Sequence, residues 1–170
     1  PIYTTLTFAL EKEERESTET VWEVRLDTVI ATKPSIVLNH NTEEKEIVIQ
    51  DAANRLYLID KNGKILWNRQ LDGKIISEIA QIDFFNNSKL QLLFNTENKI
   101  YCIDRNGNWV DGFPVKLKSK ATNGLTLIDY DKNKNYRVFI ATSDNKVYLY
   151  NKEGNIVEGW DFDKTQGKVE

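Results

Sequence analysis

Three segments of the chain repeat one pattern, and their spacing constrains the fold more than any other feature. The segments are Asn54–Asp60, Asn98–Asp104 and Asn145–Asn151, each beginning with Asn, a basic residue, an aliphatic residue and Tyr. Each is followed by a turn that contains a glycine: Gly63, Gly107 or Gly154. The chain therefore contains three copies of a unit of about 40–50 residues, and a period of that length indicates a repeat architecture.

Each repeat is predicted to contain four short β-strands. The first strands are expected at Ser35–Leu38, Ile75–Phe85 and Leu125–Tyr130, and the second at Ile47–Gln50, Gln91–Phe94 and Arg137–Ala141. The third strands are the repeated segments themselves, and the fourth are expected at Lys64–Gln70, Trp109–Val115 and Ile156–Asp161. The pairs Asn62-Gly63 and Asn106-Gly107 are typical of tight hairpins in which both turn residues have positive φ, and Glu153-Gly154 takes their place in the third repeat.

The third strands are apolar on both faces, which distinguishes between all-β folds. In the first repeat Leu56 and Leu58 point to one side and Tyr57 and Ile59 to the other. A sheet with one wet face would alternate apolar and polar residues, whereas a sheet packed between two neighbours is apolar on both sides. The pattern predicts β-propeller blades, with equivalent buried residues at Leu56, Ile100 and Val147 and with Pro114 in an exposed outer strand.

The strand count predicts about three and a half four-stranded antiparallel blades. Residues 1–26 form a partial blade in which Ile2–Leu10 pairs with Val21–Leu26, with an acidic connector at residues 11–20. The blades are expected at residues 27–71, 72–116 and 117–163, followed by a tail at residues 164–170. Closed rings have about four or more blades, and this chain starts at Pro1 with no Met, so we expect a segment of a longer propeller.

Composition excludes several classes of function. The chain has 23 basic and 26 acidic residues, a net charge of −3, whereas a general nucleic-acid binder carries a basic field. No apolar run approaches the roughly 18–20 residues that span a bilayer. Cys102 is the only cysteine, so an internal disulfide and a multi-cysteine metal site are both excluded.

The segment Tyr57–Gly73, which contains Asn62, Gly63 and Trp67, resembles the quinoprotein-type (PQQ-like) β-propeller repeat. This repeat occurs in quinone-dependent dehydrogenases and in a propeller lipoprotein of bacterial outer-membrane assembly. The later repeats lack the Trp at its usual place, and Gly112-Phe113-Pro114 is similar to integrin-like (FG-GAP-type) repeats. The resemblance implies a propeller architecture and favours a periplasmic or cell-surface location, but it implies no particular activity.

Candidate catalytic residues are few. His40 is the only histidine, and we interpret it as a solvated loop residue because no nucleophile motif accompanies it. Cys102 lies on an apolar strand face, where burial raises a thiol pKa and removes reactivity. A quinone-dependent dehydrogenase would need a complete ring with a central cofactor site. The sequence therefore predicts no enzyme activity and no bound cofactor.

One loop could bind calcium. Asp129, Asp131, Asn133 and Asn135 place side-chain oxygens at positions 1, 3, 5 and 7, which is a spacing that calcium uses. However, Lys134 stands at position 6 and Arg137 at position 9, in place of a glycine and an acid. The favoured interpretation is a polar turn in which Asp and Asn cap backbone groups, and a calcium site is the alternative.

These observations predict a non-enzymatic interaction or scaffold module of a larger protein. The resemblance to PQQ-like repeats favours a bacterial envelope-associated protein. Its partner would be another protein or the remainder of the parent propeller, with weak self-association through the terminal blades. The alternative is a calcium-stabilised propeller that binds a glycan or other ligand. The aromatics Trp109, Phe113 and Trp160 are interpreted as packing between blades rather than binding a partner.

Overall fold

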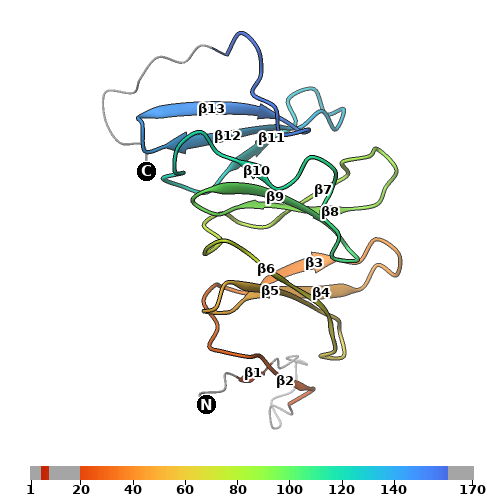
Figure 1. Ribbon diagram of the computed structural model, residues 1–170. Coiled ribbons are helices and arrows are strands. Elements are labelled where there is room, and N and C mark those ends of the chain that lie inside the picture. The colour runs from red at the N-terminus through yellow and green to blue at the C-terminus, as the bar shows by residue number, and fades with distance from the viewer. Residues whose placement is uncertain (1–4, 8–19, 161–170) are drawn as a thin grey trace, which may run out of the picture. The chain divides into compact units, whose positions relative to one another are not determined.

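The computed structural model describes residues 5–7 and 20–160, and all regular elements in these ranges are β-strands (Figure 1). The chain divides into two compact units, one of residues 1–38 and 44–71 and one of residues 39–43 and 72–170. Each unit is described by itself. The acidic connector, apart from Thr20, and the predicted tail at residues 164–170 lie outside the described residues.

The first unit contains a two-stranded and a four-stranded antiparallel sheet. In the smaller sheet β1 (Thr5–Thr7) pairs with β2 (Glu23–Arg25), which confirms the pairing predicted between these parts of the chain. The larger sheet has the order β3-β4-β5-β6. Its strands are β3 (Ser35–Leu38), β4 (Lys45–Gln50), β5 (Arg55–Ile59) and β6 (Ile65–Gln70), close to the predicted bounds.

The two sheets of the first unit share an apolar core. Val24 of β2 and Leu26, which directly follows that strand, pack against Ile49, Tyr57 and Ile59 of the large sheet. The remaining members of this cluster are Ile47 and the partly buried Trp22, Ile30 and Ile65. All side chains of β5 after Arg55 are buried, as expected for a strand that is apolar on both faces.

The second unit contains two further antiparallel sheets. The first has the order β10-β9-β8-β7 and the second the order β11-β12-β13. The strands are β7 (Ala80–Ile82), β8 (Gln91–Asn95), β9 (Lys99–Asp104), β10 (Val115–Lys116), β11 (Thr126–Ile128), β12 (Arg137–Thr142) and β13 (Lys146–Asn151). A shared core that includes Ile100, Cys102, Ile140 and Tyr150 lies between the two sheets. The repeats thus form separate sheets, as predicted.

The predicted fourth strands of the second unit are wrong in extent. Trp109 makes only an isolated bridge to Ile103, and β10 begins six residues later. Between them the chain turns out of the sheet, with the Phe113 N–H bonded to the Val110 carbonyl at 2.9 Å and Gly112 at a φ of 84°. In the third repeat Ile156 makes an isolated bridge to Tyr150, and no fourth strand follows within the described residues.

The turns after the third strands differ from the predicted hairpin type. Gly63 has a φ of 82°, but Asn62 is not at positive φ. The Asp60 carboxylate instead accepts hydrogen bonds from the N–H groups of Asn62 and Lys64, both at 2.9 Å. An aspartate-capped turn needs one left-handed residue rather than two, which Gly supplies without strain. The same arrangement recurs around Asp104, Asn106 and Gly107, and around Asn151 and Gly154.

The glycine turns also lie under side chains of the preceding sheet. A Cβ on Gly63 would lie 2.7 Å from Cε3 of Trp22, and a Cβ on Gly154 would lie 2.3 Å from Cγ2 of Val115. These two glycines are therefore required both by the backbone and by close packing. Trp67, the residue of β6 equivalent to Trp22 in the repeat, is buried.

Burial of the three equivalent third-strand residues is confirmed for two of them. Leu56 and Ile100 are fully buried, whereas Val147 is half-buried, so this part of the prediction is wrong. Tyr148 and Tyr150 pack into the core of the second unit, which turns Val147 to the opposite face of the sheet. There Trp160 contacts the sheet, its Nε1 donating to the Val147 carbonyl at 2.8 Å.

Candidate functional site

Two equivalent loops at one end of the second unit include the four residues considered as calcium ligands. Residues 83–90 join β7 to β8, and residues 129–136 join β11 to β12. We refer to them as the paired loops. Each begins with an aspartate, Asp83 or Asp129, and each has left-handed residues at the same two places, with φ between 53° and 64°. Their similarity shows that the loop conformation belongs to the repeat.

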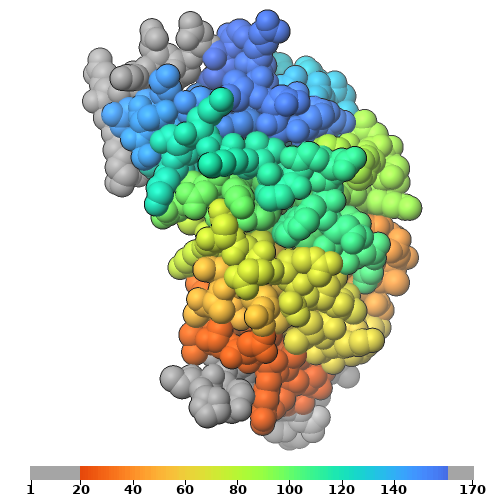
Figure 2. Space-filling view, in the orientation of Figure 1, coloured from red at the N-terminus to blue at the C-terminus, as the bar shows by residue number. Residues whose placement is uncertain are grey.

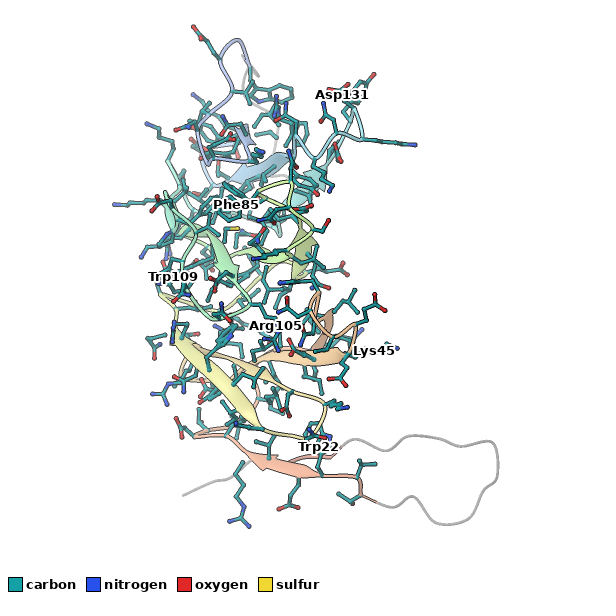
Figure 3. The ribbon with its side chains drawn as sticks, turned by 90° about the vertical axis from the view of Figure 1, so that its right-hand side faces the viewer. Trp22, Lys45, Phe85, Arg105, Trp109 and Asp131 are labelled. Carbon is teal, nitrogen blue, oxygen red and sulfur yellow. The ribbon has the colours of Figure 1, made fainter. Side chains whose placement is uncertain are left out.

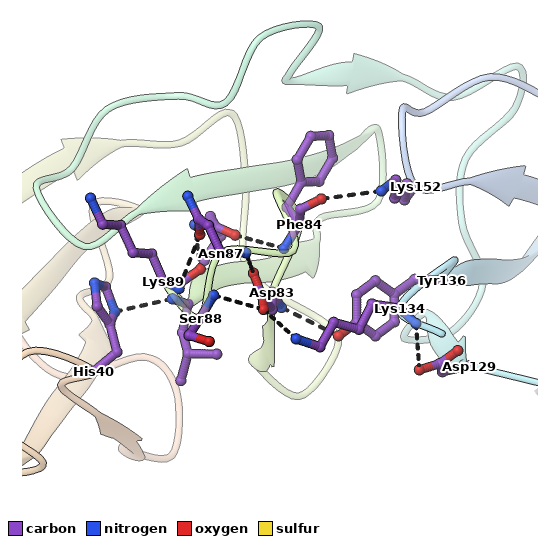
Figure 4. A network of polar contacts seen from close by, with 12 residues as sticks. His40, Asp83, Phe84, Asn87, Ser88, Lys89, Asp129, Lys134, Tyr136 and Lys152 are labelled. Atoms are coloured by element: carbon purple, nitrogen blue, oxygen red, sulfur yellow. Dashed lines mark hydrogen bonds and ion pairs between the residues drawn. The ribbon is translucent and has the colours of Figure 1, made fainter. Parts of the chain in front are cut away.

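Asp83 fixes the backbone of the first loop. Its two carboxylate oxygens accept hydrogen bonds from the N–H groups of Asn87 and Ser88, both at 2.9 Å (Figure 4). Lys134 of the second loop donates to Oδ2 of Asp83 at 2.6 Å, and the Tyr136 hydroxyl accepts from the Asp83 N–H at 3.3 Å. Asp83 therefore holds its own loop and also connects the paired loops.

The charge state of Asp83 follows from these contacts. Burial acts to raise the pKa of its carboxyl, but hydrogen bonds from Lys134, Asn87 and Ser88 outweigh that effect and lower the pKa from 3.8. The pKa of Lys134 is raised by the hydrogen bond to Asp83. Both groups are thus charged at neutral pH. Because Asp83 is 4% exposed, its charge needs this partner.

The residues of the predicted calcium loop lie in the second of the paired loops, where their oxygens mostly serve the protein. Both Asp129 oxygens accept backbone N–H groups, from Asn133 at 3.1 Å and from Lys134 at 3.0 Å. Oδ1 of Asn133 accepts from the Asn135 N–H at 2.9 Å. Asp131 is exposed on the loop (Figure 3).

The fourth predicted ligand is also engaged, since Oδ1 of Asn135 accepts from the Arg137 guanidinium at 2.8 Å. Within residues 5–7 and 20–160, no three His, Cys, Asp or Glu side chains group in a way that could hold a metal ion. The geometry matches the capped-turn interpretation. Calcium binding stays the alternative interpretation, which this arrangement does not test.

The paired loops present two aromatic side chains to solvent. Tyr130 is 87% exposed and Phe85 is 53% exposed. The ring of Phe85 meets that of Phe84 edge-on, with centroids 4.9 Å apart. Phe84 is fixed in turn by Lys152, which donates to its carbonyl at 3.2 Å and lies 5.6 Å from its ring centroid. Exposed aromatics on a fixed backbone are a feature of protein interfaces.

Sequence reasoning missed Phe85 and Tyr130 as surface residues. The signal was present, because an aromatic residue follows each loop aspartate, at residues 84–85 and at residue 130. The aromatics that were considered instead all contact other parts of the protein, but packing between blades is confirmed for Phe113 alone. Trp109 lies against Tyr101, with ring centroids 5.3 Å apart, while Phe113 packs on the core of the second unit and Trp160 on a ring of β12.

The two residues considered for catalysis have structural surroundings. Nδ1 of His40 accepts a hydrogen bond from the Leu90 N–H at 3.0 Å, and His40 is half-buried, so its interpretation as a solvated residue is wrong. The reason is that residues 39–43 lie in the second unit, beside the first of the paired loops. Cys102 is fully buried, and burial raises the pKa of its thiol to about 12. This confirms its expected burial on an apolar strand face.

Comparison with known proteins supports the architecture. No protein-family model matches the sequence, and no curated protein matches it. Among solved structures, the chain is similar to BBS1N in complex with ARL6DN, with a TM-score of 0.55 at 14% identity over 82% of this chain and 42% of that one. A second structure of that complex gives a TM-score of 0.56 at 16% identity, covering 84% and 46%.

A third similar structure is BamB from Moraxella catarrhalis, with a TM-score of 0.52 at 14% identity over 92% of this chain and 51% of that one. At these identities the likeness concerns the fold alone. The fold is that of a partial β-propeller. The chain spans about half or less of the length of these propellers.

Proposed function

We propose that the chain is a non-enzymatic interaction module of a larger propeller protein, and that the paired loops contact its protein partner. The observation that carries the proposal is the exposure of Tyr130 and Phe85 on the paired loops. The backbone of each loop is fixed by an aspartate, Asp83 or Asp129, that accepts hydrogen bonds from backbone N–H groups. Large aromatic side chains on a rigid backbone contribute contact area at little cost in conformational entropy. Loops held by a sheet scaffold are also common binding sites.

The comparisons support an interaction role without naming the partner. BBS1N was crystallised in complex with ARL6DN, so one similar propeller contacts another protein. The similarity to BamB of a bacterium, together with the resemblance of Tyr57–Gly73 to PQQ-like repeats, supports our proposal of an extracytoplasmic, envelope-associated location. No helix in the described part of the chain is long and apolar enough to cross a membrane.

Site-specific photo-crosslinking at residue 130 tests the proposal. A photoreactive phenylalanine derivative replaces Tyr130, which is almost fully exposed and can be changed without disturbing the core. We expect one dominant protein adduct in cells that express the parent protein, and we expect Phe85→Ser to reduce it. A photoreactive residue at Ile36, which is 65% exposed in the first unit, is the control. Equal, diffuse labelling from both positions would refute the proposal.

Glycan binding and self-association are the two alternatives to a separate protein partner, and each has its own measurement. Exposed aromatics also stack on sugars, so calcium-dependent retention on immobilised glycans, without a protein adduct, would favour a glycan-binding propeller. Self-association through the outer face of the third sheet, where Val147 is half-buried, would appear as a concentration-dependent sedimentation coefficient. An adduct between two copies of the chain would identify the partner as the protein itself.

A further inference from the structure

Two lysines face each other across the outer edge of the second sheet. β10 pairs with β9 in a register that places Lys116 directly opposite Lys99 and Val115 opposite Ile100. Ile100 and Val115 pack into the core of the second unit, so both lysines project from the other face. Opposed residues have Cβ atoms about 4.5–5.5 Å apart, and like charges at that separation repel. The sheet edge therefore carries an unfavourable pair.

The chain continues the basic pattern beyond β10. Leu117 and Ala121 are buried, whereas Lys116, Lys118 and Lys120 are exposed. The alternation keeps the lysines in solvent while the residues between them anchor the segment. Figure 2 shows the segment around residues 110–120, in teal, at the surface of the second unit.

Carboxylates of the same unit neutralise only part of this charge. Nζ of Lys120 lies 3.2 Å from Oε2 of Glu97, and Nζ of Lys99 lies 4.0 Å from Oδ2 of Asp72. Lys116 and Lys118 make no ion pair with any residue of the described ranges. We call Lys99, Lys116 and Lys118 the lysine edge. It is a local basic strip on a chain whose net charge is −3.

We propose that the lysine edge binds a short, extended acidic segment of the partner protein. Residues two apart in an extended chain are about 6–7 Å apart, so acidic side chains at alternate positions can follow the alternate lysines. A short acidic segment fits better than a nucleic acid or an anionic membrane, because the strip is small and the whole chain is acidic. Lysines on sheet edges also hinder strand pairing, but that role alone does not require two of them face to face. The inference rests on the proposed function, since it gives the chemistry of the partner.

Fluorescence anisotropy with a labelled octapeptide of alternating Glu and Ser tests this inference on the full chain. At low salt we expect saturable binding that weakens at least about tenfold as ionic strength rises through 0.2 M. The matched peptide of alternating Gln and Ser should not bind. The double variant Lys116→Glu/Lys118→Glu should weaken binding about tenfold or more. The control Lys33→Glu/Lys45→Glu changes the same charge on exposed lysines of the first unit, and it should change affinity less than about twofold.

Several results would overturn the inference. Absence of saturable binding at low salt would do so, as would equal weakening by the two double variants. Tighter binding of a duplex oligonucleotide or of anionic vesicles, with the same dependence on Lys116 and Lys118, would show that the occupant is another polyanion. A partner crosslinked at residue 130 together with no peptide binding would leave the interaction module standing and refute the lysine edge alone. Peptide binding without any partner crosslinked at residue 130 would support the lysine edge and refute the proposed contact at the paired loops.

Discussion

Asn95→Ala should destabilise the second unit strongly, because the Asn95 side chain connects its two sheets. Asn95 is fully buried at the end of β8. Its Oδ1 accepts from the Leu125 N–H at 2.8 Å, just before β11, and its Nδ2 donates to the Thr96 carbonyl at 2.9 Å. The alanine variant leaves both of these backbone groups without their partner. The amide is thus a buried hydrogen-bonded connection between the second repeat and the start of the third.

The expected loss of unfolding free energy is about 2–4 kcal/mol, since each buried group left without a partner costs roughly 1–3 kcal/mol. With an m-value of about 2–3 kcal/mol/M, the urea midpoint should fall by about 1 M. Equilibrium unfolding followed by far-UV circular dichroism and tryptophan fluorescence measures this change. Hydrogen exchange adds a local readout, because the Leu125 amide should exchange faster in the variant.

Asn87→Ala is the matched control. Asn87 is exposed, and its Oδ1 accepts only the local Lys89 N–H at 3.0 Å, so the loss should stay within about 1 kcal/mol. The reasoning is refuted if Asn95→Ala costs no more than the control, or if exchange of the Leu125 amide does not change. Either result would mean that the Asn95 amide contributes little to the connection between the two sheets.

Three further predictions concern other features. Gly63→Ala should lower the free energy of unfolding in urea by about 2–3 kcal/mol, because the new Cβ clashes with Trp22 and alanine is strained at a positive φ. Gly159→Ala also has a positive φ but lies in open space, so it should cost about 1 kcal/mol. Equal losses would contradict the packing role of Gly63. Asp83→Asn should flatten the fall of stability as pH falls below about 5, because the pKa of Asp83 is lowered in the fold. The Asp83 carboxylate stabilises the fold above its ordinary pKa of 3.8, and this contribution is lost as pH falls through the lowered pKa. Calcium at about 5 mM should raise the melting temperature by less than about 1 °C, and a larger rise that Asp129→Ala abolishes would establish the site.

Much of the architecture was predictable from the sequence because it depends on local chemistry. The repeat spacing and the apolar runs on both strand faces predicted separate sheets, and four strands of the first unit lie where expected. Gly63 was correctly placed in a turn, since a left-handed residue there favours glycine. The burial of Cys102 followed from its position on an apolar strand.

Other features depended on contacts that the residue pattern does not show, some of them between residues far apart in the chain. Asn62 kept negative φ because the Asp60 carboxylate caps the turn, and β10 began late because the chain bulges out at Gly112. His40 accepts a hydrogen bond from the Leu90 N–H, fifty residues away, and no local pattern predicts such a contact. Exposure of Tyr130 and Phe85 was likewise decided in space, where neighbouring loops do not cover them.

The sequence by itself determined the repeat, the order of the first three strands of each repeat and most of the residues that are buried, because periodicity and turn chemistry act over a few residues. Only the tertiary structure decided how charge is placed. It gave Asp83 its lysine across the paired loops, and it set Lys116 opposite Lys99 at a sheet edge. Such pairs form between segments that the chain brings together only when strands find their register, and register is a property of the folded sheet.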